Sequence, residues 1–242
     1  GCGTDAAPYC AKNQKETMVH DPIDLVYLWC DSSDAKWRAR KDAVARAHGI
    51  KTGDAANATY RFAANDELRY SLRSAEMYVP WVRKVFLLID DDNTPPEWLR
   101  LDHPRLRIAR LSEFMPAERL PCYCSPTIEH HMARIPDLAE RFIYANDDMM
   151  FARPLKPDFF FAPDGFPICR FAGKRHTLDW TPLDAYHAQI KRAADVIVAE
   201  YHDVRGDLLE ALELLPHHAA DSYLKSDMLK CFSKYESDIT ET

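Results

Sequence analysis

Short apolar runs alternate with longer amphipathic stretches over the first two thirds of the chain. The apolar runs are rich in β-branched and aromatic residues and end in polar residues, which is typical of buried strands that lead into loops. Strands are therefore predicted over Ile23 to Trp29, Val85 to Ile89, Leu106 to Leu111 and Arg141 to Ala145.

The amphipathic stretches carry apolar residues at helical spacing and predict three helices. The first runs from Ala35 to His48, the second from Asp66 to Tyr78 with Asn65 as its N-cap, and the third from Pro126 to Arg141. Strands that alternate with helices indicate an α/β fold, in which a mostly parallel sheet is flanked by helices.

The last third of the chain is mainly helical in its pattern. An amphipathic helix is predicted over Asp184 to Tyr201 and another over Ser222 to Phe232; we expect both to pack on the sheet or to form a small cap. No repeat or glycine-rich linker divides the sequence, so we expect a single domain over residues 23–242 after an N-terminal extension over residues 1–22.

Charge and glycine content exclude several classes of protein. Lys and Arg number 31 against 38 Asp and Glu, a net charge of −7, with no run of five like charges, which argues against a nucleic-acid partner. The apolar runs are far shorter than the roughly 18 residues of a membrane span. Glycine is scarce, 7 of 242 residues, and forms neither a dinucleotide-binding motif nor a P-loop.

The cysteine pattern favours a reducing compartment. Seven cysteines are scattered without a CxxC pair, which indicates neither a disulfide framework nor a zinc ribbon. Cys2 and Cys10 can pair in an oxidising compartment, and this alternative stays open. The N-terminus shows no signal-peptide pattern, so we expect a cytoplasmic location with at most peripheral association with the inner face of the membrane.

Acidic residues follow three of the predicted strands: Asp31 and Asp34, then Asp90 to Asp92, then Asp147 and Asp148. Ligands of open α/β sheets bind at the carboxyl ends of strands. Mg²⁺ binds one or two carboxylates together with substrate phosphates, so these acids suit a nucleotide diphosphate. Aspartates also form turns after strands, and Asp90 to Asp92 is predicted to be such a turn.

Basic residues and histidines supply further candidates. Arg69 and Arg73 lie one helical turn apart and can hold a phosphate or form ion pairs with neighbouring acids. Glu129 is followed directly by two histidines, a spacing that excludes a same-face zinc site. His217 and His218 can supply a base or a ligand, or can be solvated.

Several of these segments, taken in order, resemble the signatures of the Stealth family. The stretch from Ile23 to Asp34 resembles the first signature. The second is matched by Asn65 to Ser74, Pro80 to Arg83, Pro96 to Leu99, Ile128 to His131, Arg134 to Pro136 and Arg141 to Asp148. The third is matched loosely by His218 to Ala220 with Lys225 in register, and His217 is the alternative because Ala220 replaces a proline.

The Stealth family is similar to bacterial capsule polysaccharide phosphotransferases and to the catalytic region of N-acetylglucosamine-1-phosphotransferase. The resemblance implies a nucleotide-sugar-transferase-like fold that moves a hexose- or N-acetylhexosamine-1-phosphate from a UDP-sugar to a glycan hydroxyl and releases the nucleoside monophosphate. The alternatives are a metal-dependent glycosyltransferase and a non-catalytic domain that binds sugar nucleotides or glycans.

The resemblance also implies roles for residues. Asp147 and Asp148 are expected to hold Mg²⁺ or Mn²⁺, and Asp148, Glu129 and His218 to act in catalysis. We favour His218 as the base and Glu129 as the group that orients the acceptor or a metal-bound water, because a carboxylate near a helix start is a weak base. The residues expected to bind the substrate are Asp31, Asp34, Asp66, Arg69, Arg73 and His131. The family also uses an arginine beyond the last printed residue, so we expect a catalytic domain truncated at its C-terminus.

Overall fold

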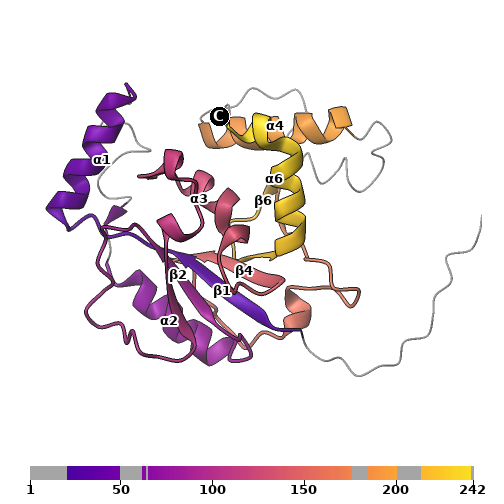
Figure 1. The fold of residues 1–242 in the computed structure, drawn as a ribbon. Coiled ribbons are helices and arrows are strands. Elements are labelled where there is room, and N and C mark those ends of the chain that lie inside the picture. The colour runs from indigo at the N-terminus through magenta and orange to yellow at the C-terminus, as the bar shows by residue number, and fades with distance from the viewer. Residues whose placement is uncertain (1–20, 50–61, 64, 176–184, 201–213, 241–242) are drawn as a thin grey trace, which may run out of the picture.

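A five-stranded sheet forms the centre of the fold, with the strand order β3-β2-β1-β4-β7 (Figure 1). The computed structural model describes residues 21–49, 62–63, 65–175, 185–200 and 214–240. The four parallel strands are β1 (Ile23–Leu28), β2 (Val85–Ile89), β3 (Leu106–Arg110) and β4 (Arg141–Asn146). The predicted α/β class and the four predicted strands are confirmed.

The central strands are buried on both faces, which explains their continuous apolar sequences. In β1, Leu28 lies opposite Leu88 of β2 and Asn146 of β4, so the carboxyl ends of these strands meet at one edge of the sheet. Loops that carry polar residues leave the sheet at this edge.

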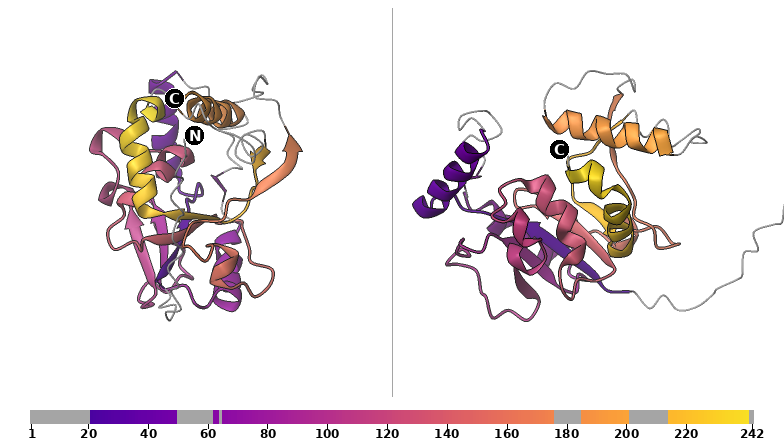
Figure 2. Two further views of the ribbon diagram at one scale, coloured as in Figure 1. Left: turned by 90° about the vertical axis from the view of Figure 1, so that its right-hand side faces the viewer. Right: turned by 45° about the horizontal axis from the view of Figure 1, so that its top comes forward.

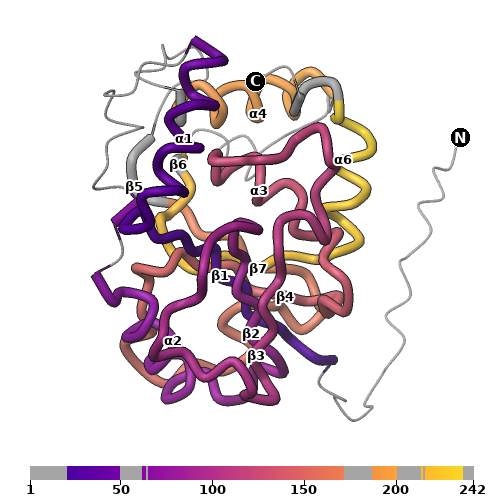
Figure 3. Tube along the Cα trace, turned by 60° about the vertical axis from the view of Figure 1, so that its left-hand side comes forward, coloured from indigo at the N-terminus to yellow at the C-terminus, as the bar shows by residue number. Residues whose placement is uncertain are grey.

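Helices cover both faces of the sheet. On one face, α2 (Glu67–Tyr78) packs Leu68 and Ala75 against the side chains of β1 and β2. On the other face, α3 (Ser125–His131) contributes Ile128 to a second core cluster, beside Met228 of α6 (Lys225–Thr240). Helix α1 (Ala35–Ala47) follows the carboxyl end of β1 and extends away from the sheet (Figure 3).

The predicted helix over Pro126 to Arg141 is wrong in its length. Helix α3 ends at His131 and a single 3-10 turn over Met132–Arg134 follows. Pro136 disfavours a helical conformation in the residue before it, and Ile135 accordingly has a ψ angle of 126°. Ile135 nevertheless lies in the same core cluster as Met132, so the apolar positions were predicted correctly although the helix was not.

The predicted helix over Ser222 to Phe232 also begins too early. Residues Asp221–Leu224 form β7, which pairs antiparallel with β4, and α6 begins only at Lys225. The Tyr223 ring stacks on Phe142 of β4 at 5.5 Å, and Ser222 Oγ donates a 2.8 Å hydrogen bond to the carbonyl of Phe160. These long-range contacts favour a strand over the helix that the local sequence indicates.

Helix α4 (Ala185–Glu200) confirms the described part of the helix predicted from Asp184 to Tyr201, whose two end residues lie outside the described residues. It lies beside the C-terminal half of α6 and away from the sheet (Figure 2), with an ion pair between Glu200 and Lys234. Two further strands, β5 (Phe171–Arg175) and β6 (Leu214–Pro216), form a small antiparallel sheet. Of the two C-terminal helices, α6 packs on the main sheet.

The start of α2 differs from the prediction that Asn65 caps it. The N-cap is Asp66, in a left-handed conformation with φ of 65°, and its side chain makes no capping hydrogen bond. Asn65 instead donates through its side-chain Nδ2 to Glu67 at 2.9 Å. Helix α2 therefore begins one residue later than predicted.

Asp24, near the start of β1, holds three segments together from a fully buried position. Its carboxylate accepts hydrogen bonds from Arg83 Nε at 2.9 Å and Nη2 at 2.6 Å, and from the backbone N–H groups of Lys84 at 3.1 Å and Ala139 at 2.7 Å. This residue belongs to the first Stealth-like signature, and its contacts give it a structural role.

The five cysteines within the described residues are free thiols, whereas Cys2, Cys10 and most of the expected N-terminal extension lie outside those residues. Among the helices that the structure describes, none combines the length and the apolar character needed to cross a membrane.

Candidate functional site

The carboxyl edge of the sheet gathers the predicted strand-end acids. Asp31 follows β1, and Asp147 and Asp148 follow β4, the strand paired with β1. Strand β7 runs in the opposite direction, so its first residue, Asp221, lies at the same edge, opposite Tyr144. The sheet therefore brings together acids from three separate segments of the chain.

Cys30 lies among these acids. Burial, together with the carboxylates of Asp147, Asp31 and Asp90, raises the pKa of its thiol to about 12. The thiol stays protonated at neutral pH, so Cys30 is unsuited to act as a nucleophile. Its surroundings show that the acids which follow β1, β2 and β4 lie close to one another.

Asp147 is one of the two predicted metal ligands, and its pKa is shifted. Burial raises its pKa to about 6, with further contributions from the carboxylates of Asp148 and Glu67. Asp148 is exposed, and Glu67 begins α2 on the neighbouring face of the sheet. A cation bound here would relieve the repulsion among these three carboxylates.

The described residues contain no group of three or more His, Cys, Asp or Glu side chains arranged to hold a metal ion. Mg²⁺ commonly binds one or two carboxylates and completes its coordination with water and substrate phosphates. Asp147 and Asp148 fit a metal of this kind, and they do not form a closed protein cage.

Glu129 lies on the other side of β4 and is the third candidate carboxyl group. Tyr144 Oη lies 3.0 Å from Glu129 Oε1 and 2.9 Å from Asn146 Oδ1. Burial raises the pKa of Glu129, the Asp221 carboxylate raises it further, and the Tyr144 hydrogen bond opposes this shift. The expectation that a helix start weakens this base is wrong, because Glu129 lies in the second half of a seven-residue helix.

His218 and Asp221 lie near Glu129 from the C-terminal part of the chain. Burial raises the pKa of Asp221 to about 6, while Arg170, His218 and His217 act in the opposite direction. Both histidines are exposed and precede strand β7. His218 lies within electrostatic reach of Glu129.

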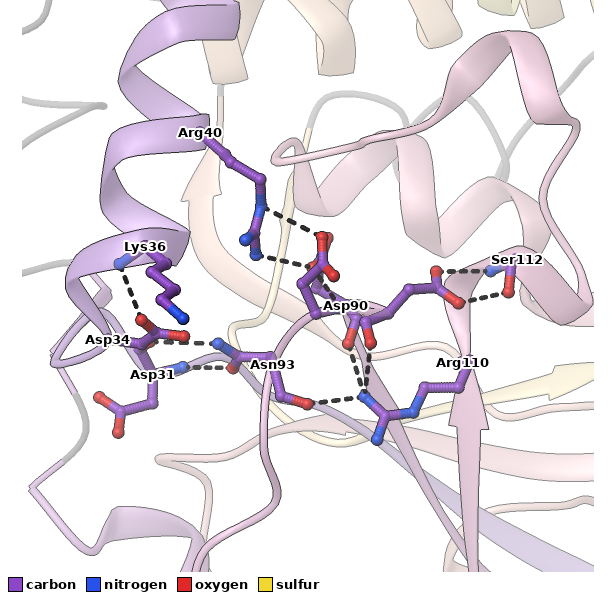
Figure 4. A network of polar contacts seen from close by, with 10 residues as sticks. Asp31, Asp34, Lys36, Arg40, Asp90, Asn93, Arg110 and Ser112 are labelled. Carbon is purple, nitrogen blue, oxygen red and sulfur yellow. Dashed lines mark hydrogen bonds and ion pairs between the residues drawn. The ribbon is translucent and has the colours of Figure 1, made fainter.

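Asn93 fixes the loop that contains Asp31. Its side chain accepts a 2.9 Å hydrogen bond from the backbone N–H of Asp31 and donates a 3.3 Å bond to the Asp31 carbonyl (Figure 4). The Asp31 carboxylate accepts hydrogen bonds from the Ser33 backbone and hydroxyl groups at 2.7 and 2.6 Å, and Asp34 caps α1 through the backbone N–H of Lys36. Both predicted substrate-binding aspartates thus also shape the loop.

Residues Asp90 to Asp92 form the predicted turn. Arg40 of α1 pairs with Asp90 at 3.9 Å and Asp92 at 3.2 Å, and Asp91 accepts hydrogen bonds from Ser112 (Figure 4). The turn, which follows β2, therefore connects α1 to the segment that follows β3. Its carboxylates already have protein partners.

The predicted phosphate-binding arginines lie on α2. Arg69 pairs with Asp66 at 3.8 Å and lies over the Trp98 ring, whose Nε1 donates a 3.1 Å hydrogen bond to Asp66. Arg73 is exposed and lies over the Tyr70 ring at 6.0 Å. These contacts match the ion-pair alternative for Arg69, and binding of substrate by Asp66, Arg69 and Arg73 stays a prediction.

His131 lies apart from the strand-end acids. It is 3% exposed, its Nδ1 lies 2.8 Å from the Thr127 carbonyl, and its ring packs against Phe232 of α6 at 5.0 Å. These contacts give His131 a packing role between two helices.

Tyr144, Asn146 and Asp221 are the residues of this site that sequence reasoning did not select. Tyr144 lies in an apolar strand and resembles a core residue in the sequence. The sequence offers one local sign that Asp221 belongs to the site, its position three residues after His218. Their grouping depends on the pairing of β4 with β7.

Comparisons with known proteins identify the same region of the chain. Residues 61–168 match the Stealth protein conserved region 2. The exopolysaccharide phosphotransferase CpsY of Mycobacterium leprae is 42% identical over 175 residues, 72% of this chain and 31% of that protein. CpsY of Mycobacterium tuberculosis H37Rv is 44% identical over 150 residues, 62% of this chain and 27% of that protein.

An exopolysaccharide phosphotransferase of Streptomyces coelicolor is 44% identical over 146 residues, 60% of this chain and 23% of that protein. The chain thus spans less than a third of the length of these relatives. The matched residues include α2, β2, β3, α3, β4 and the candidate acids that follow β4. Residues 61–168 of the chain thus carry the conserved region 2 of the Stealth family, the family that the sequence motifs resemble.

Proposed function

We propose that this chain transfers a sugar 1-phosphate from a nucleotide sugar, a UDP-sugar, to a glycan hydroxyl in the synthesis of a capsular or other extracellular polysaccharide. The observation that supports this proposal is that two carboxyl groups, Asp147 and Glu129, both act on Tyr144 of β4: each raises the pKa of the Tyr144 hydroxyl, and the pKa of each is itself raised. The curated relatives that share this region are named exopolysaccharide phosphotransferases, which supports the same reaction class.

Glu129 is the proposed general base. A carboxyl group with a raised pKa is a stronger base than an ordinary carboxylate once it is ionised, and Tyr144 holds it in place. His218 is the alternative base, because it lies near Glu129 and is exposed to an acceptor.

The proposed reaction forms one bond and breaks one bond at phosphorus. The acceptor oxygen bonds to the phosphorus that carries the sugar while its proton passes to Glu129. The bond from this phosphorus to the oxygen of the nucleoside phosphate breaks, and the electron pair leaves with the nucleoside monophosphate. The bond between the sugar and its phosphate stays intact, so the anomeric configuration is retained.

Asp147 and Asp148 are the proposed ligands of Mg²⁺ or Mn²⁺. A bound divalent ion would offset the negative charge of the diphosphate and of the departing nucleoside monophosphate. The Asp31 loop, held by Asn93, lies at the same edge and is proposed to contact the nucleotide sugar.

Product analysis tests the proposal. The chain is incubated with a UDP-sugar, Mg²⁺ and a polysaccharide acceptor, and nucleotides are separated by anion-exchange chromatography. Acceptor-dependent release of UMP is expected. Release of UDP would indicate a glycosyltransferase, and donor binding without release of either nucleotide would indicate a binding domain.

A further inference from the structure

The inner face of α1 carries a buried positive charge beside aromatic rings. Trp37 and Lys41 lie one helical turn apart and are 2% and 6% exposed. The Trp37 ring packs against Phe62 at 5.7 Å and, edge to face, against Tyr123 at 5.3 Å. Lys41 Nζ lies 4.3 Å from the centre of the Phe62 ring.

Two hydrogen-bond donors in this cluster are buried without an acceptor, and the Arg40 guanidinium lies beside one of them, the Tyr123 hydroxyl. Trp37 Nε1 and Tyr123 Oη are buried without hydrogen-bond partners. Among the residues that the structure describes, Lys41 Nζ has a ring face as its contact and no carboxylate within 4.0 Å. Buried polar groups are normally paired, and an unpaired ammonium group is especially costly to bury. The cluster therefore matches a ligand that is anionic and rich in oxygen acceptors.

This face adjoins the candidate site. Helix α1 follows the Asp31 loop directly, and the backbone N–H of Ser32 donates a 2.8 Å hydrogen bond to the carbonyl of Phe62. Lys41 and Asp147 act with opposite sign on the pKa of Cys30, so both lie near the end of β1. Arg40, the residue before Lys41, points to Asp90 and Asp92 (Figure 4).

We propose that Lys41 binds a phosphate group of the nucleotide-sugar diphosphate, with Trp37 Nε1 and Tyr123 Oη as neutral donors to the same nucleotide. An ammonium group suits a phosphate because it presents a compact charge and several N–H donors. The strand-end carboxylates repel an anionic donor, and Lys41 offsets part of this repulsion. The inference rests on the proposed function for the identity of the ligand and on the structure for the position of the charge.

Binding of inorganic pyrophosphate in the presence of Mg²⁺, measured by isothermal titration calorimetry, tests the inference without requiring turnover. The test variants are Lys41→Met and Lys41→Gln, and Lys41→Arg restores the charge. Lys36→Met is the matched control, because Lys36 is an exposed lysine on the same helix. We expect both neutral variants to bind pyrophosphate about tenfold more weakly or worse, and Lys41→Arg and Lys36→Met to bind within about threefold of the unaltered chain.

Thermal unfolding without ligand separates binding from a structural role. Since Lys41 is buried without a counter-ion, Lys41→Met is expected to keep or raise the melting temperature. A lowered melting temperature together with unchanged pyrophosphate affinity in both neutral variants would show that Lys41 serves the fold, and would overturn the inference. Failure of the unaltered chain to bind pyrophosphate would overturn it as well.

The transfer assay keeps the two proposals distinct. If the neutral variants lose pyrophosphate binding while the unaltered chain releases no UMP from a UDP-sugar, the phosphate subsite stands and the proposed function fails. If the unaltered chain releases UMP and Lys41→Met binds pyrophosphate normally, the proposed function stands and the subsite is wrong.

Discussion

Tyr144 Oη lies 3.0 Å from Glu129 Oε1 and 2.9 Å from Asn146 Oδ1, so one hydroxyl group contacts two acceptor oxygens. A tyrosine has one proton to donate. When Glu129 is ionised, that proton bonds best to the carboxylate, and the Asn146 amide must turn its NH₂ group toward the hydroxyl oxygen. When Glu129 is protonated, the carboxyl group can donate to Tyr144 instead. The protonation state of Glu129 is therefore coupled to Tyr144.

Replacement of Tyr144 by Phe should move the acidic limb of the pH profile of kcat/KM to higher pH. The Tyr144 hydrogen bond lowers the pKa of Glu129, so its loss leaves the raising effect of burial unopposed. A hydrogen bond to a charged group stabilises that group, so its loss should give a measurable displacement of the limb. Tyr70→Phe, at an exposed position on α2, serves as the control and should leave the limb unchanged.

The same profile distinguishes the two candidate bases. If Glu129 is the base, Glu129→Gln abolishes the acidic limb and His218→Ala retains it. The reverse result would assign the role to His218. An acidic limb that stays in place in Tyr144→Phe would show that Glu129 does not control it.

Asp148→Asn should weaken metal binding and abolish transfer while leaving the fold intact, because the side chain is exposed and follows the end of β4. Loss of one of two carboxylate ligands should weaken Mn²⁺ binding about tenfold or more. Titration with Mn²⁺ followed by electron paramagnetic resonance measures this affinity, and UMP release measures activity.

The control variant is Asp90→Asn, which should affect Mn²⁺ binding and UMP release far less, because the Asp90 carboxylate pairs with Arg40 within a turn. Full activity of Asp148→Asn with Mg²⁺ would contradict the metal assignment.

Asp221 should make the protein less stable as the pH rises from about 4 to about 6. Its ordinary pKa is 3.8 and burial raises the pKa to about 6 in the folded state. Between these values the folded state retains a proton that the unfolded state has lost, so the free energy of unfolding falls as pH increases. Asp221→Asn removes the carboxyl group that causes this fall in stability. The variant should therefore be more stable at pH 7.5 by about 1 to 2 kcal/mol, after allowance for partial exposure.

Urea denaturation of Asp221→Asn at pH 4 and pH 7.5 measures this effect, and the gain should be confined to the higher pH. Asp158→Asn, at an exposed position, is the matched control and should change the stability little at either pH. An equal gain at both pH values would show that proton binding by Asp221 is not the cause.

The strands of the parallel sheet were predictable because their burial on both faces demands continuous apolar sequences. Strand β7 was not predictable, since its four residues carry little pattern and its partner, β4, is about eighty residues away in the sequence. Pro136 is a local signal against a helix that continues to Arg141, because proline restricts the residue before it.

The positions of Asp147 and Asp148 could likewise be predicted, because a strand end fixes them locally. The environment of Glu129 could not be predicted, because its burial and its contact with Tyr144 arise when α3 packs on β4. Lys41 poses the same problem, since a lysine in an amphipathic helix is ordinarily solvated. Only the packing of Phe62 against α1 shows that this lysine is buried.

Asp24→Ala should destabilise the fold severely without altering the chemistry of the site. The substitution leaves the Arg83 guanidinium without its carboxylate partner and removes the acceptor of the Lys84 and Ala139 backbone N–H groups. Breaking a buried ion pair from one side costs about 3 to 5 kcal/mol, which urea denaturation can measure. The control is Asp21→Ala, which removes an exposed aspartate that pairs with Arg141 at 3.3 Å and should cost less than about 1 kcal/mol of stability.

Because Asp24 lies at the start of β1, away from the carboxyl edge, any folded fraction of Asp24→Ala should keep the kcat of the unaltered protein. A stable variant with reduced kcat would contradict the structural role and would place Asp24 in the reaction itself.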